Sequence, residues 1–238
     1  MAKPLSSPPA SDTPPRAVLF DAYGTLFDVY SVALVAEQLF PRAGDALARL
    51  WRDKQIEYTR LVSMSGTYRP FWQLTQDALQ FSAAALGLTL GAEAEAQLMN
   101  QYRHLSAFPE NREVLQALKA RGVPTGILSN GDPEMLAIAV RSAGLTELID
   151  RVLSVHATGR YKTDPAAYQV GVDAMGLPAR EILFVSSNGW DAVGATWFGF
   201  RTLWINRSGG PLERLHCEPH GLGRSLRDVL ALFPPAAP

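Results

Sequence analysis

The sequence predicts an α/β fold in which a doubly wound parallel, Rossmann-like sheet carries an inserted helical-bundle cap domain. Apolar runs at residues 17–20 and 182–185 show no alternation, which is typical of strands buried on both faces of a parallel sheet. From Pro109 onward, strand and helix patterns alternate. Residues 29–107 show helical spacing and no period of two, and they are far too long for an ordinary connection between a strand and a helix.

Composition and length limit the classes of protein that the chain can belong to. The 238 residues suffice for a full hydrophobic core, and a net charge of -1 without a basic run argues against partners such as nucleic acid or an anionic membrane. Cys217 is the single cysteine, which excludes a disulfide framework and a thiolate metal cluster. No apolar run is long enough to span a membrane, and we expect a cytoplasmic protein.

Three segments are expected along the chain. Residues 1–15 are rich in Pro, Ser and Ala and lack the apolar stretch of a secretory signal, which predicts a disordered tail. Residues 16–28 together with 108–234 are predicted to form the Rossmann-like core domain. Residues 29–107 are predicted to form the helical cap domain over it.

The predicted cap contains four helices. The spacing of apolar residues places them at about 32–40, 44–64, 70–86 and 93–105. Pro41 ends the first helix, and Pro70 opens the third. In the second helix, we expect one face to be formed by Leu47, Leu50, Trp51, Lys54, Tyr58, Leu61 and Val62.

The predicted core continues the first strand with four more strands. Helical patterns separate them, and a short helix follows near the end of the chain. The expected strands are 123–128, 151–155, 182–185 and 202–205. The expected helices are 113–121, 133–144, 165–175, a segment ending at Phe198, and 225–233.

Polar side chains follow three of the predicted strands. They are Asp21, Ser129 with Asn130, and the cluster Ser186-Ser187-Asn188 with Asp191; Lys162 precedes the helix that leads into the 182–185 strand. Parallel strands place their carboxyl ends along one edge, so these groups can share a crevice. Each residue type is also common in ordinary turns, and a single such strand end would mean little. Their combination favours a catalytic site.

These polar clusters belong to longer motifs: DAYGTLFD (21–28), ILSNG (127–131), YKTD (161–164) and FVSSNGWD (184–191). In order and spacing, the motifs resemble those of the haloacid dehalogenase superfamily, and more narrowly its L-2-haloacid dehalogenases. The resemblance covers about residues 16–233 and includes part of the predicted cap at 50–59.

The resemblance implies hydrolytic dehalogenation of short-chain L-2-haloacids to D-2-hydroxy acids through an ester on Asp21, without a metal or other cofactor. The implied catalytic residues are Asp21, Thr25, Arg52, Ser129, Lys162, Tyr168, Ser186, Asn188 and Asp191. The implied substrate-binding residues are Tyr23, Arg52, Ile56, Phe71, Ser129, Asn130 and Trp190. The implied partners are the haloacid, the halide product and a second copy of the chain in a homodimer formed partly by cap helices.

Two alternatives differ in their chemistry. A Mg²⁺-dependent phosphatase of the same superfamily is expected to carry Asp-x-Asp at the first motif. In this chain Tyr23 stands in place of the second Asp and cannot act as a carboxylic acid. A catalytically inactive scaffold that binds a partner through its cap would have no need for Asp21, Arg52, Lys162 and Asp191 together. Two departures from the family pattern are Asp53 and Thr163, where a glutamine and a proline are usual.

Overall fold

The structure is a computed structural model that describes residues 14–234. Its centre is a parallel sheet with the strand order β3-β2-β1-β4-β5-β6, which confirms the predicted doubly wound fold. The tail predicted for residues 1–15 lies, up to residue 13, outside the described residues. The strands are β1 (Ala17–Phe20), β2 (Thr125–Ser129), β3 (Arg151–Ser154), β4 (Ile182–Ser186), β5 (Arg201–Ile205) and β6 (Gly221–Gly223).

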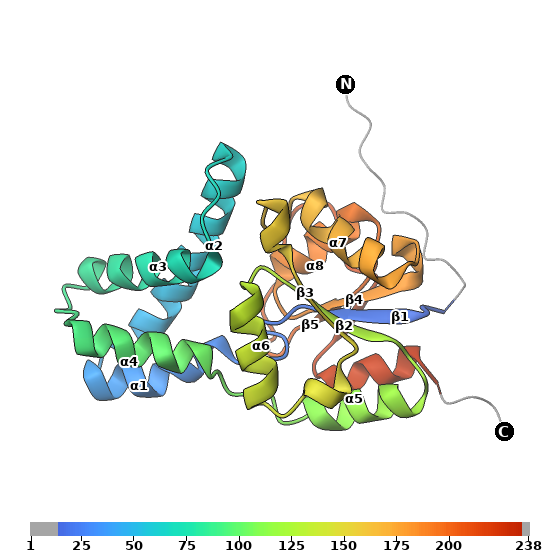
Figure 1. Ribbon diagram of the computed structural model, residues 1–238, viewed down its shortest axis with the longest axis horizontal. Helices are drawn as coiled ribbons and strands as arrows, with labels where there is room; N and C mark the ends of the chain where they lie inside the picture. Colours follow the sequence, from blue (N-terminus) through green and yellow to red (C-terminus); the bar gives the residue numbers. More distant parts are fainter. Residues whose placement is uncertain (1–13, 235–238) are drawn as a thin grey trace.

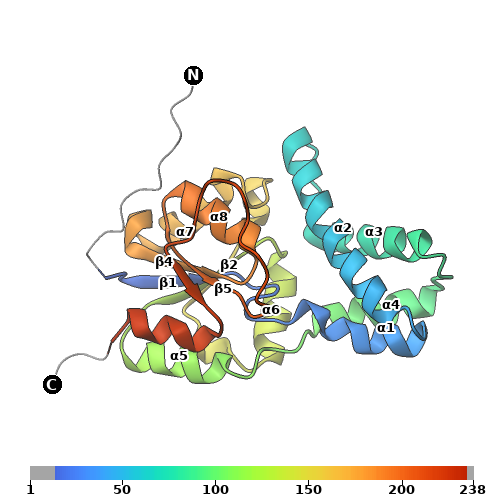
Figure 2. The same cartoon turned by 180° about the vertical axis from the view of Figure 1, so that it is seen from behind.

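Helices cover both faces of this sheet (Figure 1). On one face lie α7 (Pro165–Met175) and α8 (Gly189–Phe198). On the other lie α5 (Asn111–Ala120), α6 (Pro133–Ser142) and the 3₁₀ helix Leu226–Leu232, which packs beside α5 in the view from behind (Figure 2). The central strands β1, β2 and β4 are therefore buried along their whole length, as strands covered on both faces require, whereas the edge strands β3 and β6 are partly exposed.

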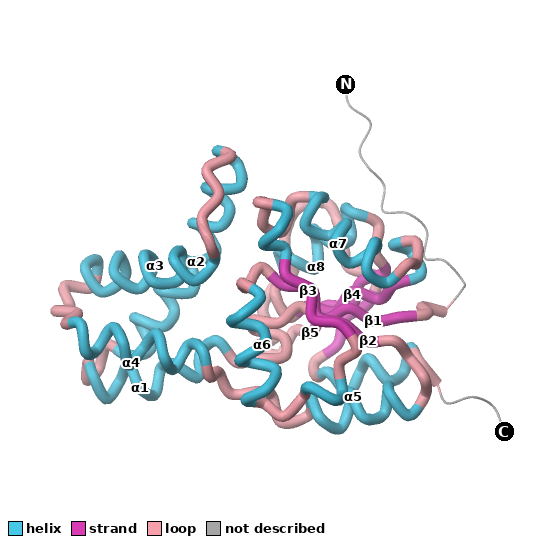
Figure 3. The backbone as a smooth tube through the Cα atoms, viewed as in Figure 1, coloured by secondary structure: helices cyan, strands magenta, loops and turns pink. Residues whose placement is uncertain are grey.

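The helices of residues 29–107 lie to one side of the sheet, beyond the carboxyl ends of its strands (Figure 3). They begin with a 3₁₀ helix (Val29–Val32) and continue as α1 (Ala33–Leu39), α2 (Gly44–Ser65), α3 (Phe71–Ala85) and α4 (Ala92–Arg103). Residues 29–107 are called the cap below. Across the described residues, no helix combines the length and the apolar character needed to cross a membrane.

The chain passes between the sheet and the cap twice, and the two connecting segments are hydrogen-bonded to each other. The Asp28 amide donates to the Ser106 carbonyl at 2.8 Å, and the Phe108 amide donates to the Leu26 carbonyl at 3.1 Å. Phe27 and Ala107 form an isolated antiparallel bridge between these bonds. The cap is thus attached through one short two-chain ribbon.

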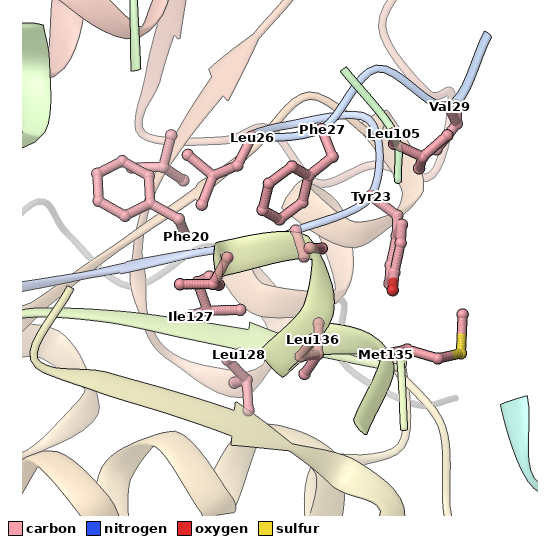
Figure 4. Packing of buried hydrophobic residues seen from close by; sticks show 14 of the residues in the cluster. Phe20, Tyr23, Leu26, Phe27, Val29, Leu105, Ile127, Leu128, Met135 and Leu136 are labelled. Carbon is pink, nitrogen blue, oxygen red and sulfur yellow. The ribbon is translucent and has the colours of Figure 1, made fainter. Parts of the chain in front are cut away.

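The end of β1 is anchored in the main hydrophobic cluster (Figure 4). Phe20, Leu26 and Phe27 are fully buried there, and Ile127 of β2 and Leu136 of α6 lie across from them. This packing fixes the turn that follows β1, because apolar side chains on both sides of the turn are buried.

Two features of the fold differ from the sequence prediction. The strand β6 is missing from the prediction, since two of its three residues are glycines, which strands disfavour. The predicted face of α2 is wrong at Leu61, whose exposed fraction is 52%. The buried face instead continues from Trp51 through the polar Gln55 and Thr59, and a hydrophobic pattern cannot reveal polar residues that face inward.

Candidate active site

Asp21 lies directly after β1, at the point where the strand order reverses. Its amide still donates to the Val185 carbonyl of β4 at 2.9 Å, so the sheet fixes its backbone. Gly24 then turns the chain with a φ of +98°, and a Cβ at this position would lie 3.3 Å from the Asn188 side-chain oxygen. A glycine is required here by both the backbone conformation and the close approach of Asn188.

Three donors hold the buried Asp21 carboxylate. Oδ2 accepts hydrogen bonds from Thr25 Oγ1 at 3.0 Å and from Asn188 Nδ2 at 2.9 Å. Oδ1 accepts from Lys162 Nζ at 3.1 Å. Side chains from three different parts of the chain therefore fix one carboxylate in a single orientation, as a nucleophile requires.

Lys162 joins this carboxylate to a second one. Its fully buried ammonium also donates to Asp191 Oδ2 at 3.0 Å. Burial opposes the positive charge, but the Asp191 and Asp21 carboxylates outweigh it and raise the pKa of Lys162. The Lys162 backbone amide donates to Asn130 Oδ1 at 2.9 Å, which ties this loop to the end of β2.

Asp191 lies in the first turn of α8 and is fully buried. Tyr168 on α7 donates from its hydroxyl to Asp191 Oδ1 at 2.7 Å. Burial raises the pKa of Asp191, although the nearby Lys162 ammonium opposes this effect. Burial of the Tyr168 hydroxyl, together with the neighbouring Asp191, raises the pKa of Tyr168 well above its ordinary value, so the hydroxyl remains a donor.

Arg52 reaches this group from the cap helix α2. Its Nη2 donates to the Tyr23 carbonyl at 3.0 Å and to Asn188 Oδ1 at 3.2 Å. Its Nη1 donates to Gln55 Oε1 at 2.8 Å. The guanidinium is nearly buried, and it brings a positive charge from the cap to within contact of the loop that carries Asp21.

A small cavity of about 20 Å³ opens beside Asp21. The cavity has room for about one water molecule. Its lining residues are Asp21, Tyr23, Arg52, Ile56, Thr59, Phe71, Ser129, Asn130 and Trp190. All seven residues that the sequence assigns to substrate binding thus lie around one cavity, together with Thr59, which falls in the cap segment of the resemblance but has no predicted role.

The remaining predicted residues shape the turns around the cavity. Ser186 Oγ accepts from the Asn188 amide at 3.2 Å and so supports the turn that carries Asn188. Ser129 Oγ accepts from the Gly131 amide at 3.1 Å in the corresponding turn after β2.

The side chains present do not fit a divalent cation at Asp21. Among residues 14–234, no group of three or more His, Cys, Asp or Glu could hold a metal ion. The Lys162 ammonium lies between the Asp21 and Asp191 carboxylates, and the amide nitrogen of Asn188 points at Asp21. A cation at this point would compete with an ammonium group for the same oxygen atoms.

Sequence reasoning missed the contacts that hold the cap against the core. Asp132, after β2, accepts from the Phe71 and Trp72 amides at 3.1 and 2.8 Å and thereby caps α3. His156 lies 3.1 Å from Asp132 and 2.9 Å from the Tyr68 hydroxyl of the cap. An Asp before a Pro predicts a cap for its own helix, whereas this one caps a helix of another segment.

A further missed residue, Arg207, supports the turn after β1 from behind. It donates to the Thr25 carbonyl at 3.1 Å and to Ser187 Oγ at 2.6 Å, and it pairs with Glu110 at 3.0 Å. Burial opposes the charge of Glu110, but hydrogen bonds from the backbone and from Arg207 outweigh it and lower the pKa of that carboxyl.

Both the sequence and the fold are similar to those of known proteins. Residues 15–199 match a family model described as haloacid dehalogenase-like hydrolase. The chain is 45% identical over 222 residues to an (S)-2-haloacid dehalogenase of Pseudomonas sp. (strain YL), covering 93% of this chain and 96% of the relative. A solved L-2-haloacid dehalogenase is 59% identical, with a TM-score of 0.91, and the match covers 93% and 99% of the two chains. Another, from Xanthobacter autotrophicus with chloropropionic acid covalently bound, is 36% identical, with a TM-score of 0.84 and coverage of 90% and 96%.

Proposed function

Because the chain belongs to the haloacid dehalogenase-like hydrolase family, we propose that it is an (S)-2-haloacid dehalogenase that hydrolyses short-chain L-2-haloacids to D-2-hydroxy acids and halide. One observation carries the proposal: the Asp21 carboxylate, held by three donors, lines a cavity whose other walls are largely apolar and include a cap arginine. A solved relative holds chloropropionic acid covalently bound, which supports a reaction through a covalent intermediate.

In the first step, an Asp21 oxygen attacks the carbon that bears the halogen. The new C–O bond forms as the carbon–halogen bond breaks, and attack from the opposite side inverts the configuration at that carbon. Ser129 and backbone amides near Tyr23 and Asn130 bind the substrate carboxylate. Lys162 holds the Asp21 carboxylate in its orientation before the attack.

The departing halide takes the bonding electron pair and needs positive charge or donors nearby. Arg52, Asn130 and Trp190 line the cavity, and we assign this role to the Arg52 guanidinium, the Asn130 side chain and the edge of the Trp190 ring. Tyr23, Ile56 and Phe71 provide the apolar wall for the alkyl group, with Tyr23 stacked on Phe71 at a centroid distance of 5.6 Å.

In the second step, water attacks the carboxyl carbon of the Asp21 ester. Asp191 accepts a proton from that water, and the bond between the Asp21 carboxyl carbon and the ester oxygen breaks. The departing alkoxide takes up this proton from Asp191 and leaves as the 2-hydroxy acid, and the Asp21 carboxylate is restored with an oxygen from water as the second proton of the water passes to solvent. Thr25 and Asn188 hold the Asp21 oxygen that they already contact. Tyr168 and Lys162 hold Asp191 in position.

A halide leaves as a stable anion, so this reaction requires no acid at the position of Tyr23. The same residue and the Lys162 bridge argue against the Mg²⁺-dependent phosphatase. We further propose a cytoplasmic homodimer formed partly by cap helices, on the basis of the family resemblance.

The decisive experiment measures halide release from each enantiomer of 2-chloropropionate in the presence of EDTA. We expect chloride from the (S) enantiomer alone and no loss on chelation. Asp21→Asn should lower the rate by roughly 10⁴-fold or more while leaving the circular dichroism spectrum unchanged, since it removes the nucleophile. Folded wild-type protein that releases no chloride, or that hydrolyses phosphate esters only with Mg²⁺, would overturn the proposal.

A further inference from the structure

Gln55 lies one helical turn after Arg52 on α2, and its side chain is fully buried between the helices of the cap. Its Oε1 accepts hydrogen bonds from Arg52 Nη1 at 2.8 Å and from the Tyr102 hydroxyl at 3.0 Å. Its Nε2 donates to Thr75 Oγ1 on α3 at 2.7 Å. The amide therefore connects the active-site arginine to two other helices of the cap.

The direction of these bonds is determined by Thr75. Its hydroxyl has a single proton, and that proton is donated to the Phe71 carbonyl at 2.7 Å. Toward Gln55 the hydroxyl oxygen is left to accept, so the amide must present its NH₂ group to Thr75. The oxygen of the amide must then face Arg52, which is a cation and only donates.

We propose that Gln55, with its amide orientation set by Thr75, is a positioning residue that holds the Arg52 guanidinium where the halide departs. The inference rests on the proposed function, because it assigns to Arg52 the stabilisation of that halide. Gln55 makes no contact with the cavity beside Asp21, whose lining includes Arg52 itself. Of the residues that line this cavity, Arg52 is the one whose side chain Gln55 hydrogen-bonds, so we expect its effect on the reaction to pass through Arg52.

The effect is not expected to reach the Asp21 nucleophile. Asn188, the side chain that connects Arg52 to the nucleophile, has two further hydrogen bonds from Nδ2, to Asp21 Oδ2 at 2.9 Å and to the Tyr23 carbonyl at 3.0 Å. These bonds keep the Asn188 amide in its orientation when Arg52 moves. The nucleophile is then still held while the donor for the leaving group is misplaced.

Leaving-group dependence separates this role from a merely structural one. Chloride is a poorer leaving group than bromide, so breaking the carbon–chlorine bond depends more on a donor that meets the developing charge. For Gln55→Met, we expect single-turnover halide release from (S)-2-chloropropionate to fall roughly tenfold to a hundredfold, the effect of losing a hydrogen bond to a charged group. Release from (S)-2-bromopropionate should fall several-fold less, with KM nearly unchanged for both.

A matched pair of variants on α3 provides the control. Thr75→Val removes the hydroxyl that orients Gln55, and Ser82→Ala removes a buried hydroxyl that likewise donates to a carbonyl four residues earlier at 2.7 Å. Thr75→Val should raise the ratio of bromide to chloride release in the direction of Gln55→Met, and Ser82→Ala should leave the ratio at the wild-type value. Thr75→Val decides the question if Gln55→Met fails to fold.

A double-mutant cycle tests whether Gln55 acts through Arg52. In an Arg52→Lys background, Gln55→Met should cause no further change in the ratio of bromide to chloride release. Equal losses for the two halides, or an unchanged ratio in folded Gln55→Met and Thr75→Val proteins, would overturn the inference while leaving the proposed function intact. Absence of halide release from wild-type protein would instead count against the proposed function.

Discussion

The buried Asp191 carboxylate has two roles whose demands on its charge differ. It pairs with Lys162 in the resting enzyme, and the proposed second step requires it to accept a proton from water. Burial raises its pKa from an ordinary value of 3.8, which makes it a better proton acceptor than an exposed aspartate. The Tyr168 hydroxyl and the Lys162 ammonium each donate to one oxygen of the Asp191 carboxylate, which fixes the orientation of that carboxylate.

The raised pKa of Asp191 predicts where activity is lost on acidification. Below its pKa, Asp191 is protonated and cannot accept the proton of the hydrolytic water. Because that pKa is raised, the rate of ester hydrolysis should begin to fall at a pH above the range of an ordinary aspartate near 3.8. The pH dependence of single-turnover 2-hydroxy acid formation measures this acid-side fall in rate. A fall whose midpoint lies at or below pH 3.8 would exclude Asp191 as the base.

Lys162 is expected to matter for stability as well as for activity. Lys162→Met leaves two carboxylates buried without their shared cation, which should cost about 3–5 kcal/mol in the free energy of unfolding. Urea denaturation measures the loss. The double variant Lys162→Met/Asp191→Asn should recover part of it, because one of the uncompensated charges is gone. Equal stabilities of wild type and Lys162→Met would contradict the pairing.

At the scale of elements, the most consequential contact is the cap that Asp132 provides for α3. The residue before α3 is Pro70, which has no side chain able to cap the helix, and the core loop after β2 supplies the missing acceptor. The same loop carries Ser129 and Asn130, which line the cavity. One loop therefore places active-site groups and also fixes the cap helix that carries Phe71.

Removing this contact should affect both stability and substrate binding. Asp132→Ala is expected to lower the free energy of unfolding by about 1 kcal/mol, a usual cost for losing a helix N-cap, and to raise KM for (S)-2-chloropropionate. The matched control is Ser225→Ala, which removes the N-cap of the 3₁₀ helix Leu226–Leu232. That variant should lose stability without a change in KM; an unchanged KM in Asp132→Ala would show that the contact serves the fold alone.

The elements of the fold differ in how far the sequence reveals them. Asp21 and Asn188 were predictable as neighbours because each follows a continuous apolar run, and parallel strands bring such ends together. Gln55 and Thr59 were not, since a polar residue on a helix looks the same whether it faces solvent or a buried arginine. The position of Gln55 three residues after Arg52 was the one available signal. The roles assigned to the site residues, and the division into cap and core, stay predictions.

At the scale of the whole molecule, the size of the cavity implies that the cap, or the side chains that close the cavity, must move before substrate can bind. A space of about 20 Å³ does not hold a three-carbon haloacid. Arg52, Ile56 and Trp190 separate this cavity from a larger cleft of about 560 Å³ between α2 and the core, and they line both. On another side of the cap, the Tyr161 amide and hydroxyl donate to Ser63 Oγ and the Arg69 carbonyl at 2.8 and 2.6 Å, which holds the cap against the core.

If substrate enters by movement of the cap, a covalent link across this contact should stop turnover. Tyr68 and His156 face each other across it, with ring centroids 5.6 Å apart, and the one native cysteine, Cys217, is buried. In the variant Tyr68→Cys/His156→Cys, bridging the two thiols with a short, reducible crosslinker should lower halide release at least tenfold, and a reductant should restore it. Each single-cysteine variant given the same treatment is the control. Full activity in the bridged protein would show instead that movements of Arg52, Ile56 and Trp190 alone admit the substrate from the cleft.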